Sequence, residues 1–316
     1  MNHKNQKDLN KIIIGHTGYI GSLLLEEIAK KEANILGISR KQSFIKNKTK
    51  TKNFLEMQSD IFRDKISEEL ILSSRQTIYI CAHNVKTNFD KRRKSLDFVY
   101  MSNKKFYVNF INNIKKLNPA KLIFLSSGGS LYNNTDISNP SDENSNLNPL
   151  SEYGLSKFIL ENFLINFSKQ YQIPLIICRV STIYGDSPSA RKFGFINYLK
   201  ECALKNIYPV IYGKDTYRDY LHIEDLINIL IKIGNNDLSS NTYNIAYGKS
   251  YSCLEIYEKV KKFFNQFGIQ LKDFEDKGIR EGENNKIFIS SNKLKNKLSW
   301  RPKININEGI RNIQTY

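Results

Sequence analysis

The sequence is poor in the residues that build disulfide-stabilised domains, zinc modules and membrane spans. It has four cysteines among 316 residues, and these lie far apart, with no C-x-x-C pair and no histidine at metal-ligand spacing. This spacing argues against a disulfide scaffold and against a zinc site. No apolar run approaches the roughly 18–20 residues that cross a bilayer, and residues 1–11 are too polar for a secretory signal. We expect a cytoplasmic protein with no metal and no membrane partner.

Acidic residues are also few, and the excess of basic residues raises the question of partners. The 48 Lys+Arg against 31 Asp+Glu give a formal net charge of +17. Such a charge can serve nucleic acids, anionic membranes or phosphorylated small molecules. The lysines are scattered singly through Asn- and Ile-rich sequence, apart from short runs such as 91–94, as a coding bias would also produce. The charge by itself therefore assigns no partner.

Short apolar runs alternate with helical periodicities, which indicates an α/β protein. The hydrophobic content of 40% and the aromatic content of 12% are enough for a packed core. The alternation is typical of a Rossmann-type, doubly wound parallel sheet, whose crossover helices cover both faces. The expected strands are 11–14, 33–38, 77–81, 121–125 and 174–180, and the expected helices are 20–31, 96–117 and 152–171.

The rhythm changes after residue 185, which indicates a second unit. Residues 186–225 are rich in Gly, Pro and Tyr, and residues 251–316 mix helical patterns with short strands. We predict a Rossmann domain over residues 1–185, with 226–250 returning to it, and a smaller C-terminal lobe from 186–225 and 251–316. Ligands of doubly wound sheets bind at the carboxyl edge, where the strand order reverses.

A glycine-rich turn follows the first expected strand. Its sequence is Gly15-His16-Thr17-Gly18-Tyr19-Ile20-Gly21, and a helix is expected to begin within it. Glycines permit a tight turn, let a pyrophosphate approach the backbone and allow the helix to pack on the strand. The positive end of the helix dipole then faces the phosphates. The position within a strand–turn–helix unit predicts a dinucleotide site.

The end of the second expected strand bears on which dinucleotide binds. An NAD site usually has an acid there for the ribose hydroxyls, whereas this chain has Ser39-Arg40-Lys41. A hydroxyl with two cations suits the 2′-phosphate of NADP, and ordinary solvated charges are the alternative. Asp60, after a segment that can form a third strand, is assigned to the adenine amino group, with a helix N-cap as the alternative.

Tyr153 and Lys157 lie four residues apart and thus on one face of an expected helix. A phenol with the ordinary pKa near 10 is a poor base at neutral pH. A neighbouring ammonium and an oxidised nicotinamide both favour the phenolate, so we expect the pKa to fall towards neutrality. The phenol could then exchange a proton with a substrate hydroxyl as hydride moves. An exposed helix face without chemistry is the alternative.

The expected strand before this helix ends in Ser126-Ser127-Gly128-Gly129-Ser130. A hydroxyl at the carboxyl end of a strand can bind the substrate oxygen and share its proton with Tyr153. A Gly/Ser turn without chemistry is the alternative.

Together these motifs resemble those of the extended short-chain dehydrogenase/reductases, specifically the nucleotide-sugar epimerase/dehydratase family that includes UDP-glucose 4-epimerases. The resemblance covers almost the whole chain. It implies an NAD(P) cofactor, a nucleotide-sugar substrate, and a homodimer formed through helices 96–117 and 152–171. The segments that carry it are the glycine turn, the serines followed by Tyr132, the Tyr153/Lys157 pair, and residues 179–185, 217–225, 280–283 and 298–302.

The resemblance also assigns roles to individual residues. It makes Tyr153 the catalytic acid/base, Lys157 its modulator and a ribose ligand, and Asn103 the helix asparagine of a proton relay. It places Ala82 in the cofactor site. Arg218 and Arg280 match arginines that clamp the diphosphate, and guanidinium forks suit phosphate oxygens. A salt bridge of Arg218 with Asp219 or Asp225 is the alternative.

Three departures from the family pattern bear on the reaction. Gly128 stands where some members have the catalytic serine, so we choose Ser127 as the catalytic hydroxyl and hold Ser130 in reserve; both are assigned to substrate binding. Thr182, also assigned to the substrate, replaces a frequent asparagine. Residues 128–130 lack the Asp-Glu pair of the dehydratases, which argues against 4,6-dehydration.

Three functions remain open. The first, which the basic residues after the second strand favour, is an NADPH-dependent reductase of a 4-keto nucleotide sugar. The second is an NAD-dependent nucleotide-sugar 4-epimerase, which would use Tyr153 in the same way. The third is a non-catalytic dinucleotide- or RNA-binding protein, whose nucleic-acid affinity would fall steeply with salt. The intact Tyr/Lys pair argues against the third, and we expect no nucleic-acid partner.

Overall fold

One parallel sheet organises the computed structural model, which describes residues 10–30, 34–42, 54–67, 74–85, 94–132, 136, 138–186, 194–280 and 283–312. Its strand order is β10-β6-β5-β4-β1-β2-β3, and every neighbouring pair is parallel. The strands are β1 (Lys11–Ile14), β2 (Ile35–Ser39), β3 (Phe54–Gln58), β4 (Gln76–Ile80), β5 (Pro119–Ser127), β6 (Leu175–Val180) and β10 (Asn241–Ile245).

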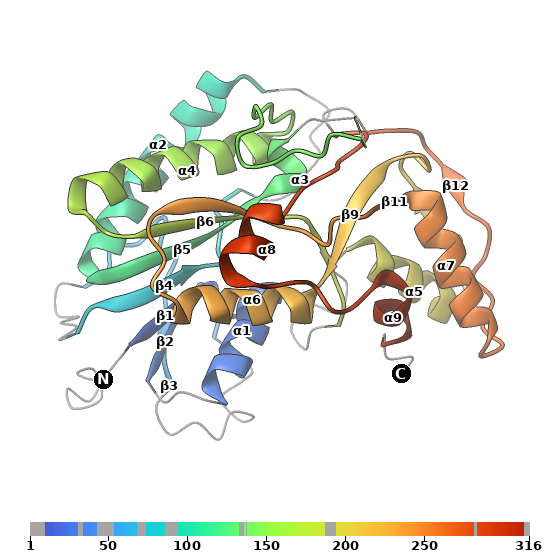
Figure 1. Cartoon of the computed structure of the whole chain (residues 1–316), viewed down its shortest axis with the longest axis horizontal. Helices are drawn as coiled ribbons and strands as arrows, with labels where there is room; N and C mark the ends of the chain where they lie inside the picture. The colour runs from blue at the N-terminus through green and yellow to red at the C-terminus, as the bar shows by residue number, and fades with distance from the viewer. Residues whose placement is uncertain are drawn as a thin grey trace.

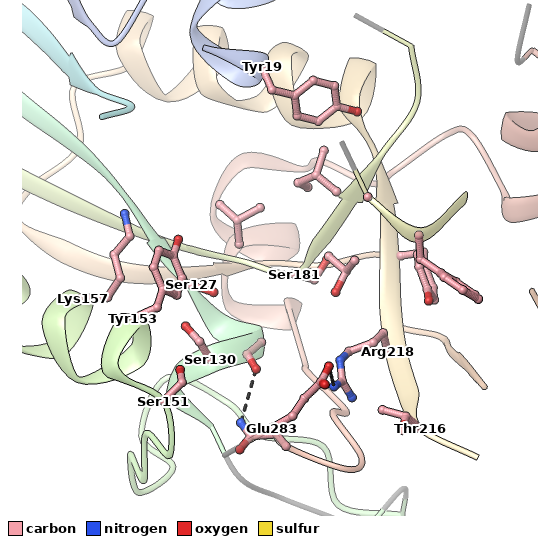
Figure 2. Close-up of a pocket in the computed structure, with 18 of the residues that line it drawn as sticks. Tyr19, Ser127, Ser130, Ser151, Tyr153, Lys157, Ser181, Thr216, Arg218 and Glu283 are labelled. Atoms are coloured by element: carbon pink, nitrogen blue, oxygen red, sulfur yellow. Dashed lines mark hydrogen bonds and ion pairs between the residues drawn. The ribbon is translucent and has the colours of Figure 1, made fainter. Parts of the chain in front are cut away.

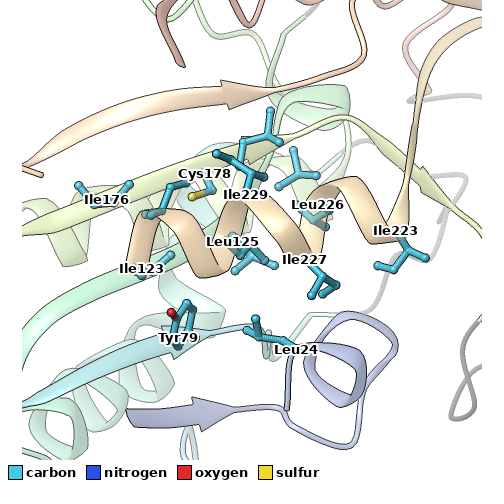
Figure 3. Close-up of a cluster of buried hydrophobic side chains, with 14 of the residues drawn as sticks. Leu24, Tyr79, Ile123, Leu125, Ile176, Cys178, Ile223, Leu226, Ile227 and Ile229 are labelled. Atoms are coloured by element: carbon cyan, nitrogen blue, oxygen red, sulfur yellow. The ribbon is translucent and has the colours of Figure 1, made fainter. Parts of the chain in front are cut away.

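Helices cover both faces of this sheet, as Figure 1 shows. One face packs against α1 (Tyr19–Ala29) and α6 (Ile223–Asn235), and the other against α2 (Leu96–Lys116) and α4 (Glu152–Tyr171). Side chains alternate between the two layers: Ile13 of β1 joins the first core, while Ile12 and Ile14 join the second. Figure 3 shows the first core, where α6 lies over the central strands. Burial on both faces explains why these strands are almost wholly apolar.

A smaller body lies beyond the carboxyl edge of the sheet, at the right of Figure 1. It has its own hydrophobic core, to which Tyr184, Leu199, Tyr220 and Phe264 contribute. A three-stranded sheet of order β11-β9-β7 and a β12-β8 pair belong to this region. Its elements are β7 (Thr182–Tyr184), α5 (Phe195–Lys205), β8 (Val210–Ile211), β9 (Tyr217–His222), β11 (Ser250–Ser252), α7 (Cys253–Asn265), β12 (Glu275–Asp276) and α9 (Ile306–Arg311).

The expected doubly wound α/β fold is confirmed. The expected strands and helices correspond to β1, β2, β4, β5, β6, α1, α2 and α4, and their ends coincide with the prediction or differ from it by one or two residues. Residue 31, the expected end of the first helix, and residue 33, the expected start of the second strand, lie outside the described residues. The strand order reverses between β1 and β4, so the crevice at their carboxyl ends is where a ligand of such a sheet binds.

Within the part of the chain that the structure describes, no helix combines the length and apolarity that a bilayer crossing needs. The described His, Cys, Asp and Glu side chains likewise form no group of three that could hold a metal ion.

Candidate active site

A cavity of about 1000 Å³ lies at the carboxyl edge of the sheet, between the sheet and the smaller body. Figure 2 shows that Tyr153, Lys157 and Ser127 lie on one side of it, and Arg218 and Glu283 on the other. The cavity therefore joins the two parts of the chain. The predicted site residues that line it are Gly18, Tyr19, Ile20, Gly21, Ser127, Ser130, Tyr153, Lys157, Thr182, Arg218 and Arg280; those that do not are Gly15, Thr17, Ser39, Arg40, Asp60, Ala82 and Asn103.

The glycine turn packs too tightly for side chains. A Cβ on Gly21 would lie 2.2 Å from the carbonyl oxygen of Gly15, and one on Gly15, whose φ is +87°, would lie 2.9 Å from the backbone nitrogen of Ala82. Gly18 is the N-cap of α1 and supplies no side-chain cap, and the first turn of α1 has no acid. A helix N-terminus with close backbone approach and no carboxylate fits a pyrophosphate. The residues present thus fit a dinucleotide.

The residues assigned to the adenosine end lie at or just after the carboxyl ends of β2 and β3. Ser39 is buried at the end of β2, and the following Arg40 is exposed. The carboxylate of Asp60 accepts a hydrogen bond from the backbone N–H of Phe62 at 3.1 Å. The Asp60 carboxylate thus caps the residues that follow it, as the alternative expects. Those residues, 61–64, form a turn and not a helix.

Tyr153 and Lys157 project from the first turns of α4 into the cavity. Ser151 caps this helix, and its Oγ accepts from the backbone N–H of Gly154 at 3.1 Å. The Lys157 ammonium donates to the carbonyl oxygen of Leu125 at 2.7 Å and lies 4.8 Å from the centre of the Phe124 ring. Lys157 therefore bridges α4 to the end of β5.

The electrostatics of this pair differ from the expectation. Burial lowers the pKa of Lys157 to about 7, and burial raises the pKa of Tyr153 to about 12. Without a bound nicotinamide, the pKa of the phenol is therefore not lowered towards neutrality. The physical reason is that both groups lose solvent, and desolvation favours the neutral form of each.

The strand-end serines surround the base of the cavity. A Cβ on Gly128 would lie 2.8 Å from Cδ1 of Ile289, so a side chain at that position would require the end of the Ile289 side chain to shift. Ser127 is half-buried and lines the cavity, whereas the hydroxyls of Ser126 and Ser130 are enclosed without a hydrogen-bond partner. Figure 2 shows Ser127 and Ser130 on the Tyr153 side of the cavity.

Arg218 is held by a partner that the sequence analysis did not name. Its Nη2 lies 2.9 Å from Oε1 of Glu283, and its Nη1 donates to the carbonyl oxygens of Tyr217 and Asn285. The expected alternative, a salt bridge with Asp219 or Asp225, is wrong.

Those two carboxylates instead anchor loops. Asp219 accepts from the backbone N–H groups of Tyr247 and Gly248 at 2.9 and 2.6 Å. Asp225 accepts from the backbone N–H groups of Lys303 and Ile304, both at 2.9 Å.

Arg280 also faces the cavity, and its guanidinium carbon lies 3.7 Å from the centre of the Tyr212 ring. The other members of its motif, Glu281 and Gly282, lie outside the described residues. Thr182 begins β7 and lines the cavity near the smaller body.

Asn103 lies apart from the cavity, inside α2. Its side chain donates to the carbonyl oxygen of Val99 at 2.9 Å and accepts from Asn84 at 2.8 Å. It is therefore linked to the segment after β4 through Asn84, and makes no hydrogen bond with Tyr153 among those of the described residues.

Two further residues near the cavity were missed by sequence reasoning. The Asn284 amide nitrogen donates to the carbonyl oxygens of Tyr132 at 2.6 Å and Gly129 at 3.3 Å, which fixes the turn that carries the serines. His83, after β4, lies against the ring of Tyr153. Neither stands at a spacing that predicts a role, because both reach the site through contacts distant in sequence.

Comparisons with known proteins agree with this geometry. The model of the NAD dependent epimerase/dehydratase family matches residues 12–246. A Methanocaldococcus jannaschii protein assigned as a UDP-glucose 4-epimerase is 27% identical, with 96% of each chain covered. A dTDP-4-dehydro-6-deoxyglucose reductase of Escherichia coli is 26% identical, with 95% of this chain and 94% of the relative covered.

Solved structures agree at the level of the fold. The UDP-glucose 4-epimerase of Thermotoga maritima, solved with UDP-glucose, superposes with a TM-score of 0.79 at 20% identity, covering 96% of this chain and 97% of that one. The enzyme of Thermus thermophilus, solved with NAD, has the same TM-score at 19% identity, covering the same shares of the two chains. The chain is a member of the NAD-dependent epimerase/dehydratase family, a family of nucleotide-sugar enzymes within the extended short-chain dehydrogenase/reductases.

Proposed function

We propose that the protein acts at C4 of a nucleotide-activated sugar and reduces a 4-keto group with NADPH. The observation that carries the proposal is one cavity lined by the glycine turn, by Tyr153 and Lys157, and by Arg218 and Arg280. A dinucleotide, a proton donor and two guanidinium groups for a diphosphate would thus meet in one space. Segments 186–225 and 251–316 would form the substrate lobe, and residues 1–185 with 226–250 the dinucleotide domain.

Tyr153 can supply the proton that ketone reduction needs. A phenol whose pKa is raised to about 12 is protonated at neutral pH, and a protonated phenol is the form that a ketone reduction needs. When bound, the nicotinamide supplies the hydride to C4. Tyr153 gives its proton to the C4 oxygen, which becomes the hydroxyl, and Ser127 orients that oxygen from the end of β5.

Lys157 has two tasks in this scheme. Its ammonium donates to the carbonyl oxygen of Leu125, which leaves donors for a ribose hydroxyl. Its pKa near 7 lets it share a proton with neighbouring hydroxyls at neutral pH without a large cost. Asn103 would support the segment after β4 through Asn84.

The preference for NADPH rests on the end of β2. Arg40 is exposed directly after buried Ser39, without a carboxylate at this strand end to bind both ribose hydroxyls. A guanidinium suits the 2′-phosphate. Asp60 would meet the adenine amino group, and Ala82 and Thr17 would border the dinucleotide.

A 4-epimerase is the second candidate, favoured by the likeness to the Methanocaldococcus jannaschii and Thermotoga maritima proteins. An epimerase retains its nicotinamide and restores its oxidation state in each turnover, whereas a reductase consumes one NADPH for each sugar reduced. Absorbance of NADPH during turnover of 4-keto and 4-hydroxy nucleotide sugars separates the two functions.

Tyr153→Phe tests the proposed chemistry. We expect dinucleotide affinity to be retained and turnover to fall by at least about a hundredfold, the lower range of general acid–base catalysis. Lys169→Met, on the last turn of α4, serves as the matched control and leaves turnover unchanged. Turnover of Tyr153→Phe close to wild type would refute the role of the phenol.

We also propose a homodimer formed through α2 and α4. Large apolar side chains on α2 are exposed, among them Phe98 (55%) and Met101 (69%). Burial of such side chains against a second copy would remove an apolar patch from water. Sedimentation of wild type and of Met101→Lys tests this, because the variant should be monomeric at concentrations where the wild type is a dimer. The four unpaired cysteines support a cytoplasmic location.

A further inference from the structure

A histidine outside every sequence motif lies against the proposed acid. The ring of His83 meets the ring of Tyr153 edge to face, with centroids 5.5 Å apart and planes at 88°. Its Nε2 lies 2.8 Å from Oγ of Ser156, which is on α4 three residues after Tyr153. His83 therefore contacts both the ring of Tyr153 and the helix that carries it.

The hydrogen bonds of Ser156 fix the tautomer of His83. Oγ of Ser156 lies 2.7 Å from the carbonyl oxygen of Tyr153, and a carbonyl oxygen can accept but not donate. The single hydroxyl hydrogen of Ser156 is thus used on Tyr153, and the His83–Ser156 contact needs a hydrogen from Nε2. In a neutral imidazole Nδ1 then carries a lone pair, and Nδ1 is enclosed without a hydrogen-bond partner.

The surroundings keep this imidazole neutral. Burial and the nearby Lys157 ammonium hold the pKa of His83 well below its ordinary value. A neutral imidazole does not compete with Tyr153 for the proton. Ser156 is tied on its other side by Tyr107 of α2, whose hydroxyl donates to the carbonyl oxygen of Ser156 at 3.3 Å.

We propose that His83 is a positioning residue for Tyr153. It donates from Nε2 to Ser156, which ties the N-terminal part of α4, and with it Tyr153, to the segment that follows β4. This inference rests on the proposed function, since the position of a phenol matters for rate only where the phenol transfers a proton. A displacement of about 1 Å at such a group can lower a rate by roughly a hundredfold.

Two substitutions separate the donor from the ring. His83→Gln keeps an N–H at the reach of Nε2, and His83→Phe keeps the aromatic edge and loses the donor. We expect His83→Phe to lower kcat roughly tenfold, because the hydrogen bond that holds Ser156 and its helix in place is lost. KM and NADPH affinity should stay within about twofold of wild type, because His83 acts on the orientation of Tyr153 and not on binding. His83→Gln should keep kcat within about threefold of wild type, because it retains the donor.

Ser156→Ala completes a double-mutant cycle. If His83 acts through Ser156, the double variant with His83→Phe loses no more kcat than the larger single loss, since both remove one interaction. Additive losses, a glutamine variant as slow as the phenylalanine variant, or a change confined to KM would overturn the proposal. Urea unfolding of each variant identifies any that fail to fold. If His83→Phe fails to fold, the kcat of His83→Gln tests the proposal, and a value outside about threefold of wild type overturns it.

A second measurement does not depend on turnover. Nitrogen-15 NMR of histidine-labelled protein distinguishes protonated from bare ring nitrogens, and loss of a signal in His83→Gln assigns it among the four histidines. We expect a neutral His83 with hydrogen on Nε2 at neutral pH. A hydrogen on Nδ1 would overturn the inference whatever the reaction is. If the tautomer is as expected but Tyr153→Phe remains active, the proposed function fails and the tie to Ser156 stands.

Discussion

Replacing Gly21 by alanine tests whether the glycine turn holds the dinucleotide. The added Cβ would lie 2.2 Å from the carbonyl oxygen of Gly15 and 2.8 Å from its carbonyl carbon. An ordinary C···O contact is about 3.3 Å or longer, so the turn and α1 must separate by about 1 Å. Both clashing groups are backbone, and no side-chain rotation can relieve them.

The size of the effect follows from this separation. Overpacking of this kind costs roughly 1–3 kcal/mol. The free protein relaxes by opening the turn, and NADPH binding must close it again. The free energy of NADPH binding is therefore less favourable by the same amount. We therefore expect NADPH affinity to fall roughly 5- to 150-fold.

Fluorescence titration with NADPH measures the change, and urea unfolding measures any loss of stability. Gly129→Ala is the matched control, because a Cβ there has no atom within 4 Å and the residue is helical. The control should bind NADPH as the wild type does and unfold at the same or higher urea. Wild-type affinity in a folded Gly21→Ala protein would show that the dinucleotide does not use this turn.

Three further predictions concern charge. Arg40→Ala should weaken NADPH binding roughly tenfold more than NADH binding, as expected for loss of a charged hydrogen bond; equal effects in titrations with the two cofactors would remove the argument for NADP. Arg218→Ala should raise KM for the nucleotide sugar roughly tenfold or more at unchanged NADPH affinity, and an unaltered KM in steady-state assays would contradict the diphosphate role. In the folded protein the pKa of Lys157 is depressed to about 7, from an unfolded value near 10.4. Between these pH values the unfolded chain binds more protons than the folded one. The free energy of unfolding, relative to that of Lys157→Met, should therefore rise with pH by up to about 1.4 kcal/mol per pH unit. Urea unfolding of both proteins between neutral pH and pH 9 checks this, and a constant difference would mean that the folded pKa is not depressed.

Much of the fold could be predicted because its signals are local. The run Lys11–Ile14 is buried on both faces, and such a strand must be apolar throughout. The glycines after it and the spacing from Tyr153 to Lys157 are also local, since one helix turn sets which side chains share a face. Strand β10 and the short strands of the smaller body were harder to predict, because their pairing partners lie far away in sequence.

The details of the site were decided by packing between distant segments. Glu283 and Arg218 are 65 residues apart in sequence, and Asn284 reaches Gly129 across 155 residues. No spacing rule connects such positions. The sequence offered Asp219 and Asp225 only as the alternative to a diphosphate role for Arg218, and both carboxylates bind backbone N–H groups elsewhere.

The sequence by itself determined which segments are apolar, where the backbone must approach a ligand, and which phenol and ammonium share a helix face. Tertiary structure decided the direction in which the pKa values of Tyr153 and Lys157 shift, the backbone contacts that exclude a side chain at Gly21, and the place of His83. Desolvation and steric exclusion are properties of an enclosed volume. They arise when segments from both ends of the chain close around the same space, and no single segment encodes them.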